Sequence, residues 1–171
     1  MLFKRLFGSD PAQQWPDVRD DEPVTLDLAR LTLCGIRLRE PADALRSIGR
    51  PANSKPHKQG IFIYPTLGLE IEHNDEMYIR HFGLVIVETG FDHVGDCRPL
   101  IITPSGPRLT IGPQTTAAEL LQHLPHPLET VIANDDEGDT VTTVKLRQCT
   151  LEIEASPLGT VRRINLDASD Q

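Results

Sequence analysis

Hydrophobic and polar residues alternate along most of this chain, and a period of two predicts β-strands. The alternating segments lie at residues 24–28, 31–38, 61–64, 67–73, 77–88, 100–103, 108–111, 128–133, 141–146, 148–154 and 160–166. Within the second segment, Gly35 stands where a tight hairpin turn needs a positive φ. The pattern therefore predicts a protein built mainly from short antiparallel strands joined by turns.

Two segments replace the alternation with helical spacing. Residues 41–48 begin with Pro41, which suits a first helical turn, and are followed by Gly49, which suits a helix end. Residues 116–124 begin with Thr116 and carry Glu119 three residues later, the pattern of a capping box. We expect one short helix in each segment.

The sequence Leu-Glu-Ile-Glu occurs twice, at residues 69–72 and 151–154. The same offset of 82 residues places 79–84 on 161–166 without a gap, and smaller offsets relate the two hairpins and the two helices. Such recurrence indicates a degenerate tandem repeat. We therefore expect an α+β protein of two similar halves, each a short helix packed on an antiparallel sheet in the order hairpin, helix, three strands. The halves either lie side by side or merge their strands into one larger sheet.

This interpretation divides the chain into four parts. Residues 1–23 comprise an amphipathic stretch and then a flexible linker, because residues 9–23 combine three prolines with several acids and show no regular pattern. Residues 24–89 form the first repeat, residues 90–98 a connector and residues 99–171 the second repeat.

Several motifs recur in a fixed order. They are a hairpin with a turn glycine, a helix ending in Gly-x-Pro, and an aromatic-x-x-Leu-Gly-Leu segment, at residues 33–38, 44–51, 64–69, 100–111 and 115–124. Together they resemble an uncharacterised bacterial family, a domain of unknown function with a duplicated hairpin-helix-sheet unit, over roughly residues 30–166. The family favours Trp-Asp-Asp where this chain has Tyr-Pro-Thr at 64–66, and Asn-Gly where this chain has Cys34-Gly35. The resemblance implies the architecture and no activity.

Composition narrows the classes of function. The 171 residues carry a net charge of −8 and no basic run longer than two residues, which disfavours nucleic-acid binding. Cys34, Cys97 and Cys149 are odd in number and widely spaced, so neither a disulfide framework nor a zinc ribbon is indicated, and a reducing cytoplasm fits. No apolar stretch approaches the length of a membrane span.

Two groups of residues could carry chemistry. One lies in the connector and offers the ligand types that bind zinc or another divalent ion, namely Asp92, His93, Asp96 and Cys97. Neighbouring side chains of one loop rarely converge, so a solvated loop is the favoured interpretation there. The other group could pair carboxylates for acid/base catalysis, namely Glu70, Glu72, Glu152 and Glu154. The leucines and isoleucines that alternate with these glutamates favour a core face, which leaves the glutamates on the solvent face of a sheet.

The motifs of nucleophile elbows, nucleotide loops and dinucleotide folds are missing from the sequence, so we predict no catalytic residue and no cofactor. The leading hypothesis is a non-enzymatic cytoplasmic module that binds a protein partner through an exposed sheet face or edge. One alternative is a metal-assisted hydrolase that uses the connector. A second is peripheral membrane association through the amphipathic N-terminus, whose apolar residues are Leu2, Phe3, Leu6 and Phe7. A frayed or locally packed terminus is the favoured interpretation of that pattern, because two turns of helix are marginally stable alone in water.

Overall fold

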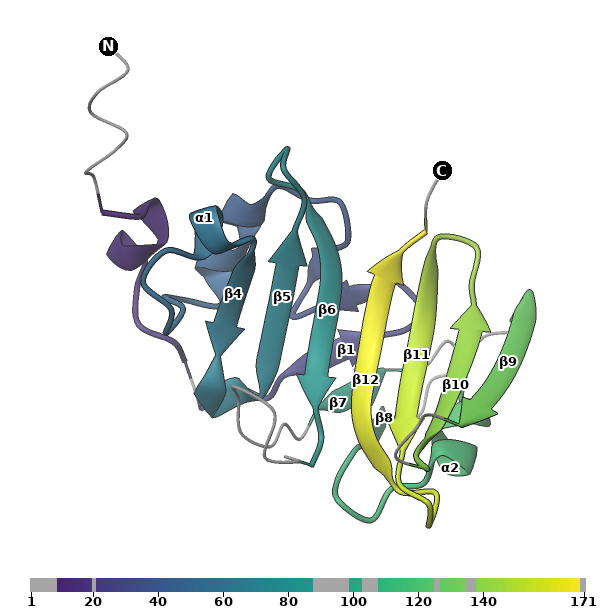
Figure 1. The fold of residues 1–171 in the computed structure, drawn as a ribbon. Helices are drawn as coiled ribbons and strands as arrows, with labels where there is room; N and C mark the ends of the chain where they lie inside the picture. Colours follow the sequence, from purple (N-terminus) through teal and green to yellow (C-terminus); the bar gives the residue numbers. More distant parts are fainter. Residues whose placement is uncertain are drawn as a thin grey trace.

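The computed structural model describes residues 9–19, 21–87, 99–102, 108–124, 127–134 and 138–169. Their fold is α+β, with two sheets and a few short helices (Figure 1). The large sheet has the strand order β4-β5-β6-β12-β11-β10-β9, and the small sheet has the order β3-β2-β1-β7-β8. Neighbouring strands of the large sheet are all antiparallel, whereas β1 and β7 of the small sheet run parallel.

The strands are short and are joined mostly by turns. Those of the large sheet are β4 (Ile61–Tyr64), β5 (Leu69–His73), β6 (Ile79–Val85), β9 (Glu129–Asn134), β10 (Thr140–Lys145), β11 (Cys149–Ala155) and β12 (Val161–Ala168). Those of the small sheet are β1 (Thr25–Asp27), β2 (Thr32–Leu33), β3 (Ile36–Arg37), β7 (Leu100–Ile102) and β8 (Arg108–Thr110). The helices are α1 (Pro56–Gln59), α2 (Ala117–Leu121) and three 3-10 turns at Pro11–Gln14, Ala42–Ser47 and Pro65–Leu67.

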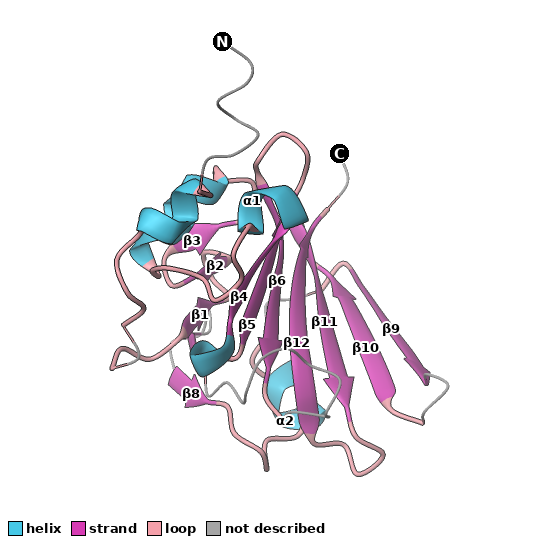
Figure 2. Ribbon diagram, turned by 60° about the vertical axis from the view of Figure 1, so that its left-hand side comes forward, coloured by secondary structure: helices cyan, strands magenta, loops and turns pink. Residues whose placement is uncertain are grey.

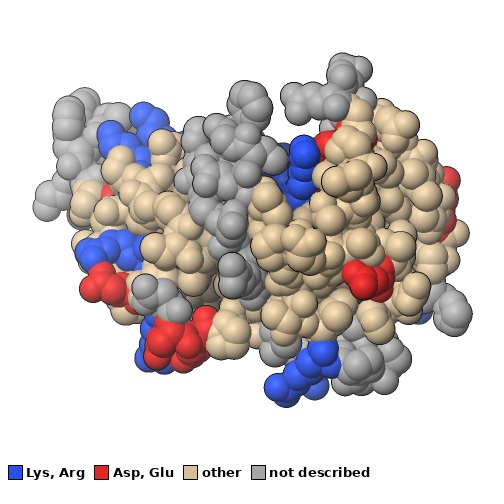
Figure 3. All heavy atoms as spheres, turned by 90° about the horizontal axis from the view of Figure 1, so that it is seen from below, with Lys and Arg blue, Asp and Glu red and all other residues tan. Residues whose placement is uncertain are grey.

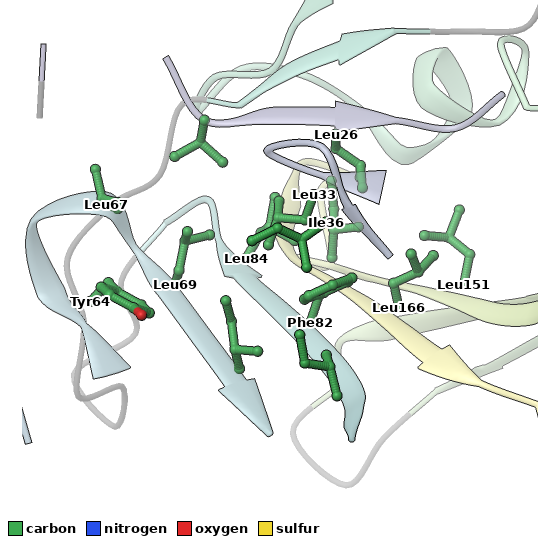
Figure 4. Close-up of a cluster of buried hydrophobic side chains, with 14 of the residues drawn as sticks. Leu26, Leu33, Ile36, Tyr64, Leu67, Leu69, Phe82, Leu84, Leu151 and Leu166 are labelled. Carbon is green, nitrogen blue, oxygen red and sulfur yellow. The ribbon is translucent and has the colours of Figure 1, made fainter. Parts of the chain in front are cut away.

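The small sheet and α2 lie on one face of the large sheet, which we call its inner face (Figure 2). The hydrophobic core fills the space between the layers. Leu26 and Leu33 of the small sheet point toward Phe82 and Leu166 of the large sheet, and all four are almost completely buried (Figure 4). Burial of this apolar surface is the main favourable term that holds the two layers together. The opposite side of the large sheet is its outer face.

The structure confirms the predicted hairpin turn at Gly35 and the predicted capping box of Thr116 and Glu119. The β2–β3 hairpin turns at Cys34 and Gly35, whose φ angles of 49° and 81° are both positive, as a type I′ turn requires. In α2 the Thr116 side chain accepts from the Glu119 amide at 3.2 Å, and the Glu119 carboxylate accepts from the Thr116 amide at 2.8 Å. The predicted capping box is therefore present.

Two helical expectations need correction. The segment predicted as a helix at 41–48 is a 3-10 helix, Ala42–Ser47, rather than an α-helix. The helix α1 lies outside the two segments for which the sequence predicts a helix, and the residue after its last turn is Gly60, with φ of 78°. Proline at the first turn and a left-handed glycine after the last are the usual helix boundaries, and the polarity of this segment concealed them.

The two Leu-Glu-Ile-Glu segments pair with their neighbouring strands in the same register. Leu69 pairs with Leu84 in the first copy, and Leu151 pairs with Leu166 at the same spacing in the second. The sequence left open whether these strands form one sheet or two, and the pairing of β6 with β12 joins them in one continuous sheet. At that seam Gly83 lies opposite Asn165, which is 82 residues later in the chain.

The segment expected to be a linker is packed against the domain from Asp10 to Val18. Asp10 caps the first 3-10 turn by accepting from the Ala12 amide at 3.0 Å, and both Ala12 and Trp15 are buried. The Trp15 ring stacks on Phe62 with a centroid distance of 5.6 Å and an interplanar angle of 3°. Prolines and acids suggested a linker because the apolar anchors in this segment are few and their partners are distant in sequence.

Gly49, predicted as a helix stop, is also the point where this N-terminal segment passes closest. Its φ is 122°, and a Cβ added there would lie 2.8 Å from the Val18 backbone. The Arg50 amide donates to the Pro16 carbonyl at 2.7 Å in the same place. Only glycine suits both the backbone angle and the close approach.

Candidate functional site

The strand β9 forms one edge of the large sheet, at the far right of Figure 1. All six of its residues are exposed, and the residue before it, Leu128, is 75% exposed. Val131 and Ile132 within the strand are 47% and 65% exposed. We call Leu128 together with β9 the β9 edge. It holds three of the five large hydrophobic side chains that are exposed in the described part of the chain.

The apolar side chains of the β9 edge project from both faces of the strand. Ile132 lies opposite Thr142 of β10, whose side of the sheet is the inner face, since Thr142 is only 2% exposed. Val131 lies opposite Thr143, on the outer face. A partner strand placed beside β9 would therefore cover apolar surface on both of its faces.

The opposite edge of the sheet, β4, is closed by the chain itself. The Ala52 amide donates to the Ile63 carbonyl at 2.8 Å, and the Ile63 amide donates to Asn53 Oδ1 at 3.1 Å. Asn53 Nδ2 donates to the Ile61 carbonyl at 2.7 Å. Along β9, by contrast, the backbone forms hydrogen bonds with β10 and with no other described part of the chain. Within the described part of the chain, nothing occupies the backbone groups of β9 that point away from β10, and such groups can pair with another strand.

The paired glutamates lie on the outer face, as the sequence predicted, and the hydrophobic residues between them are fully buried. These glutamate side chains are less exposed to solvent than the sequence predicted. Glu70 forms an ion pair with Arg163, and the two side chains are only 13% and 23% exposed. Glu152 and Glu154 accept from Asn165 Nδ2 at 3.3 Å and 3.0 Å.

Gly83 explains why this group is sheltered. It leaves a notch on the outer face, over which the side chains of His81 and Arg163 lie, so that an added Cβ would come within 3.1 Å and 3.3 Å of their nitrogens. His81 Nδ1 contacts Asp167 Oδ1 at 2.8 Å. Glu72 in turn pairs with Arg80, so each of the four glutamates has an arginine or amide partner, and the contacts join four strands. The geometry suits sheet cohesion and offers no unoccupied acid/base pair.

A second pairing of ionisable groups ties the N-terminal segment down. His57 Nδ1 contacts Asp10 Oδ1 at 2.5 Å, and its other ring nitrogen faces Asp43 Oδ1 at 3.6 Å. Both nitrogens of the ring therefore face carboxylates, and the His57 ring packs edge-on against Trp15 and Phe62. This arrangement anchors the N-terminal segment to α1.

The other sequence-based candidates lie outside the described residues. They are the possible metal ligands Asp92, His93, Asp96 and Cys97, and the amphipathic residues Leu2, Phe3, Leu6 and Phe7. Within the part of the chain that the structure describes, no three ligand-type side chains gather closely enough to hold a metal ion. None of the helices seen in those same residues has the length and apolar character needed to cross a membrane.

Charge gives no further site at the end of the molecule shown in Figure 3. There, acidic and basic side chains of the described surface lie in small separate groups among uncharged residues. Non-specific binding of a polyanion requires a continuous basic surface, and this end does not supply one.

The sequence predicted a strand at 128–133 but not its position at an edge. The run Val131-Ile132-Ala133 is apolar on both faces, which by itself favours a strand buried inside a sheet. Only the pairing order, which depends on contacts distant in sequence, places it outermost.

Comparison with models of known protein families, with curated proteins and with solved structures finds no match to this chain. The architecture and the candidate site therefore rest on the residues and geometry described above.

Proposed function

We propose that this chain is a non-enzymatic binding module that pairs an extended segment of a protein partner with the β9 edge. The observation that supports this most directly is the exposure of a whole six-residue edge strand with apolar side chains on both faces. Such strands add a strand from a partner, with backbone hydrogen bonds providing affinity and alternate side chains providing specificity.

The β9 edge also lacks the features with which proteins usually block strand addition. Edge strands are commonly protected by proline, by lysine or by a bulge. The strand Glu129–Asn134 contains no proline and no lysine, and its pairing with β10 runs without a register shift. Its single charged residue, Glu129, is already matched by Lys145 of β10 at 2.5 Å. Within the strand itself, an incoming segment would therefore meet no charge that lacks a partner.

We also propose that the two halves arose by duplication, because they share strand register and element order. The duplication shows which part of the first half corresponds to β9. The described hairpin β2–β3, the 3-10 helix and strands β4 to β6 then correspond to β7–β8, α2 and strands β10 to β12. Outside β4 lies the loop of Ala52 and Asn53, whereas the equivalent position outside β10 is occupied by β9. The second half thus carries an extra strand where the first half closes its edge.

The two alternatives of the sequence analysis remain predictions. A metal-assisted hydrolase would use Asp92 to Cys97, and membrane association would use Leu2 to Phe7, both outside the described residues. We place the protein in a reducing compartment such as the cytoplasm, because Cys34 and Cys149 are both free thiols.

Site-specific photo-crosslinking in cells that naturally express the chain tests the proposal. A benzophenone amino acid at Ile132 should give one discrete protein adduct. The same amino acid at Leu158, a turn residue between β11 and β12 that is 90% exposed, is the matched control for apolar exposure. A peptide with the sequence of the crosslinked partner segment should then protect β9 amides from hydrogen exchange in the purified protein.

The variant Val131→Lys should abolish the adduct, because lysine on an edge strand opposes strand addition. Equal adducts from Ile132 and Leu158, or peptide binding without protection of β9, would refute the proposal. An adduct of twice the chain's own mass would identify the partner as a second copy of this chain, joined through the same edge.

A further inference from the structure

A pocket of about 310 Å³ lies where the small sheet meets the end of the large sheet from which the chain leaves β12 (top of Figure 1). Its walls come from the β1–β2 turn, from β3 and the residues after it, from the β10–β11 turn and from the end of β12. The lining residues are Arg30, Leu31, Arg37, Leu38, Arg39, Arg147, Gln148, Cys149 and Ser169. Four of these nine residues are arginines, and none is a carboxylate.

Two of the four arginine side chains pair with described residues, and two do not. Arg30 pairs with Asp27 at 3.3 Å, and Arg39 donates to the Ser169 carbonyl. Both Arg37 and Arg147 are exposed, and their guanidinium groups form no hydrogen bond or ion pair with any residue that the structure describes. They come from separate sheets, so the tertiary fold and not the local sequence brings them to one pocket.

Gathering like charges is unfavourable unless something compensates them. This chain has a net charge of −8, so carboxylates for pairing are abundant elsewhere. At the pocket, the guanidinium groups of Arg37 and Arg147 are solvated and have no described carboxylate partner, so an anion from solution can reach both. Backbone geometry there is also unusual, since Leu31 and Arg39 adopt left-handed φ angles of 54° and 68° without being glycine. Such conformations concentrate at binding sites, where the surrounding structure must hold them.

The rest of the lining defines the kind of anion that would fit. Leu31 and Leu38 give the pocket an apolar side. Cys149 adds no negative charge, because burial raises the pKa of its thiol to about 11 and keeps it protonated at neutral pH. A planar guanidinium matches two oxygens of a phosphoryl group at once, which a lysine ammonium does not.

We propose that this pocket binds a small phosphorylated organic molecule of about the size of a mononucleotide. Arg37 and Arg147 hold the phosphoryl group, and Leu31 and Leu38 contact the apolar part. The volume is at the lower end of the range for small-molecule sites, and a single inorganic phosphate would leave much of it unfilled. The site lies apart from the β9 edge and does not depend on the function proposed there.

Calorimetric titration of the full chain at low ionic strength tests this with three probes: AMP, inorganic phosphate and adenosine. AMP should bind, phosphate should bind more weakly, and adenosine should not bind measurably. The double variant Arg37→Gln/Arg147→Gln should weaken AMP binding at least about tenfold, since each charge-assisted hydrogen bond contributes a comparable factor.

Two further variants keep the test specific. Arg46→Gln/Arg108→Gln makes the same change in net charge at two exposed arginines outside the pocket, and it should bind AMP like the wild type. Arg37→Lys/Arg147→Lys retains the charge without the bidentate fork and should give intermediate affinity. The proposal is wrong if the wild type binds neither phosphate probe, if both Gln double variants bind AMP equally, or if phosphate or adenosine binds as tightly as AMP.

Discussion

The two edge strands of the large sheet are finished in opposite ways. At β4, the side chain of Asn53 and the backbone of Ala52 occupy the outward hydrogen-bonding groups, and the N-terminal segment packs beside them. At β9, every residue is exposed and two apolar side chains lie on opposite faces. An unprotected edge is a hazard for aggregation, and proteins normally suppress it. The hydrogen bonds that protect β4 and the exposure of β9 are most simply explained together if the β9 edge is a binding surface.

The largest effect should come from disrupting the closed edge at its apolar anchor. Trp15→Ala removes the ring stacked on Phe62 and should lower the free energy of unfolding by about 3–5 kcal/mol, as for other large-to-small core changes. Urea denaturation followed by circular dichroism measures this. Trp15→Phe, which keeps an aromatic ring, should lose less than half as much. A loss below about 1 kcal/mol for Trp15→Ala would mean that the N-terminal segment hardly stabilises the fold.

A smaller effect should follow from removing the cap on β4. Asn53→Ala leaves the Ile63 amide and the Ile61 carbonyl without their partner and should cost about 1–3 kcal/mol. Hydrogen exchange at the Ile63 amide should accelerate at the same time. Asn53→Asp keeps the acceptor for Ile63 but loses the donor for Ile61, so it should be intermediate. Unchanged exchange in Asn53→Ala would show that this edge is closed by other means.

Alkaline pH should weaken the closed side through Tyr64 of β4. Burial raises the pKa of this phenol far above its usual value, and its hydroxyl donates to the Gly49 carbonyl at 3.2 Å. Above pH ~10 the unfolded chain loses this proton and the folded chain keeps it, so the free energy of unfolding falls by up to about 1.4 kcal/mol per pH unit. Denaturation between pH 8 and 11 should show a shallower fall in Tyr64→Phe. Tyr78→Phe, at an exposed position, controls for the loss of a tyrosine hydroxyl as such.

The smallest stability effect is expected at the open edge. Ile132→Lys replaces a side chain that is 65% exposed and should change the free energy of unfolding by less than about 0.5 kcal/mol. Leu158→Lys is the matched exposed substitution. If Ile132→Lys instead destabilised the isolated protein by as much as Asn53→Ala, β9 would be a structural strand and its value as a docking edge would be in doubt.

The parts of the fold that the sequence predicted are those determined by neighbouring residues. The type I′ turn at Gly35 and the capping box of Thr116 and Glu119 depend on contacts within four residues. Strand positions followed from alternation, and the repeated Leu-Glu-Ile-Glu segments correctly placed Leu69 and Leu151 in the core. Each of these is a local signal that tertiary structure did not override.

What escaped prediction depends on long-range contacts. Trp15 meets Phe62 across 47 positions of sequence, so its own neighbours give no sign that this segment packs against the sheet. Arg37 and Arg147 reach one pocket only after both sheets have formed. A partial signal did exist, because Arg30, Arg37 and Arg39 flank a single hairpin in an otherwise acidic chain. The fourth arginine could not be assigned to that group without the fold.

The seam between β6 and β12 has a consequence for how such a chain could originate. Phe82 lies opposite Leu166, and Leu84 lies opposite Ile164. If positions 82 residues apart are treated as equivalent, each of these two pairs is the symmetry mate of the other, and the pairing is symmetric about Gly83 and Asn165. That is the isologous register of a two-fold homodimer interface. A chain holding one half alone would expose this strand as an edge complementary to itself. Under the duplication proposed above, the present sheet would correspond to such a homodimer with its two subunits joined into one chain.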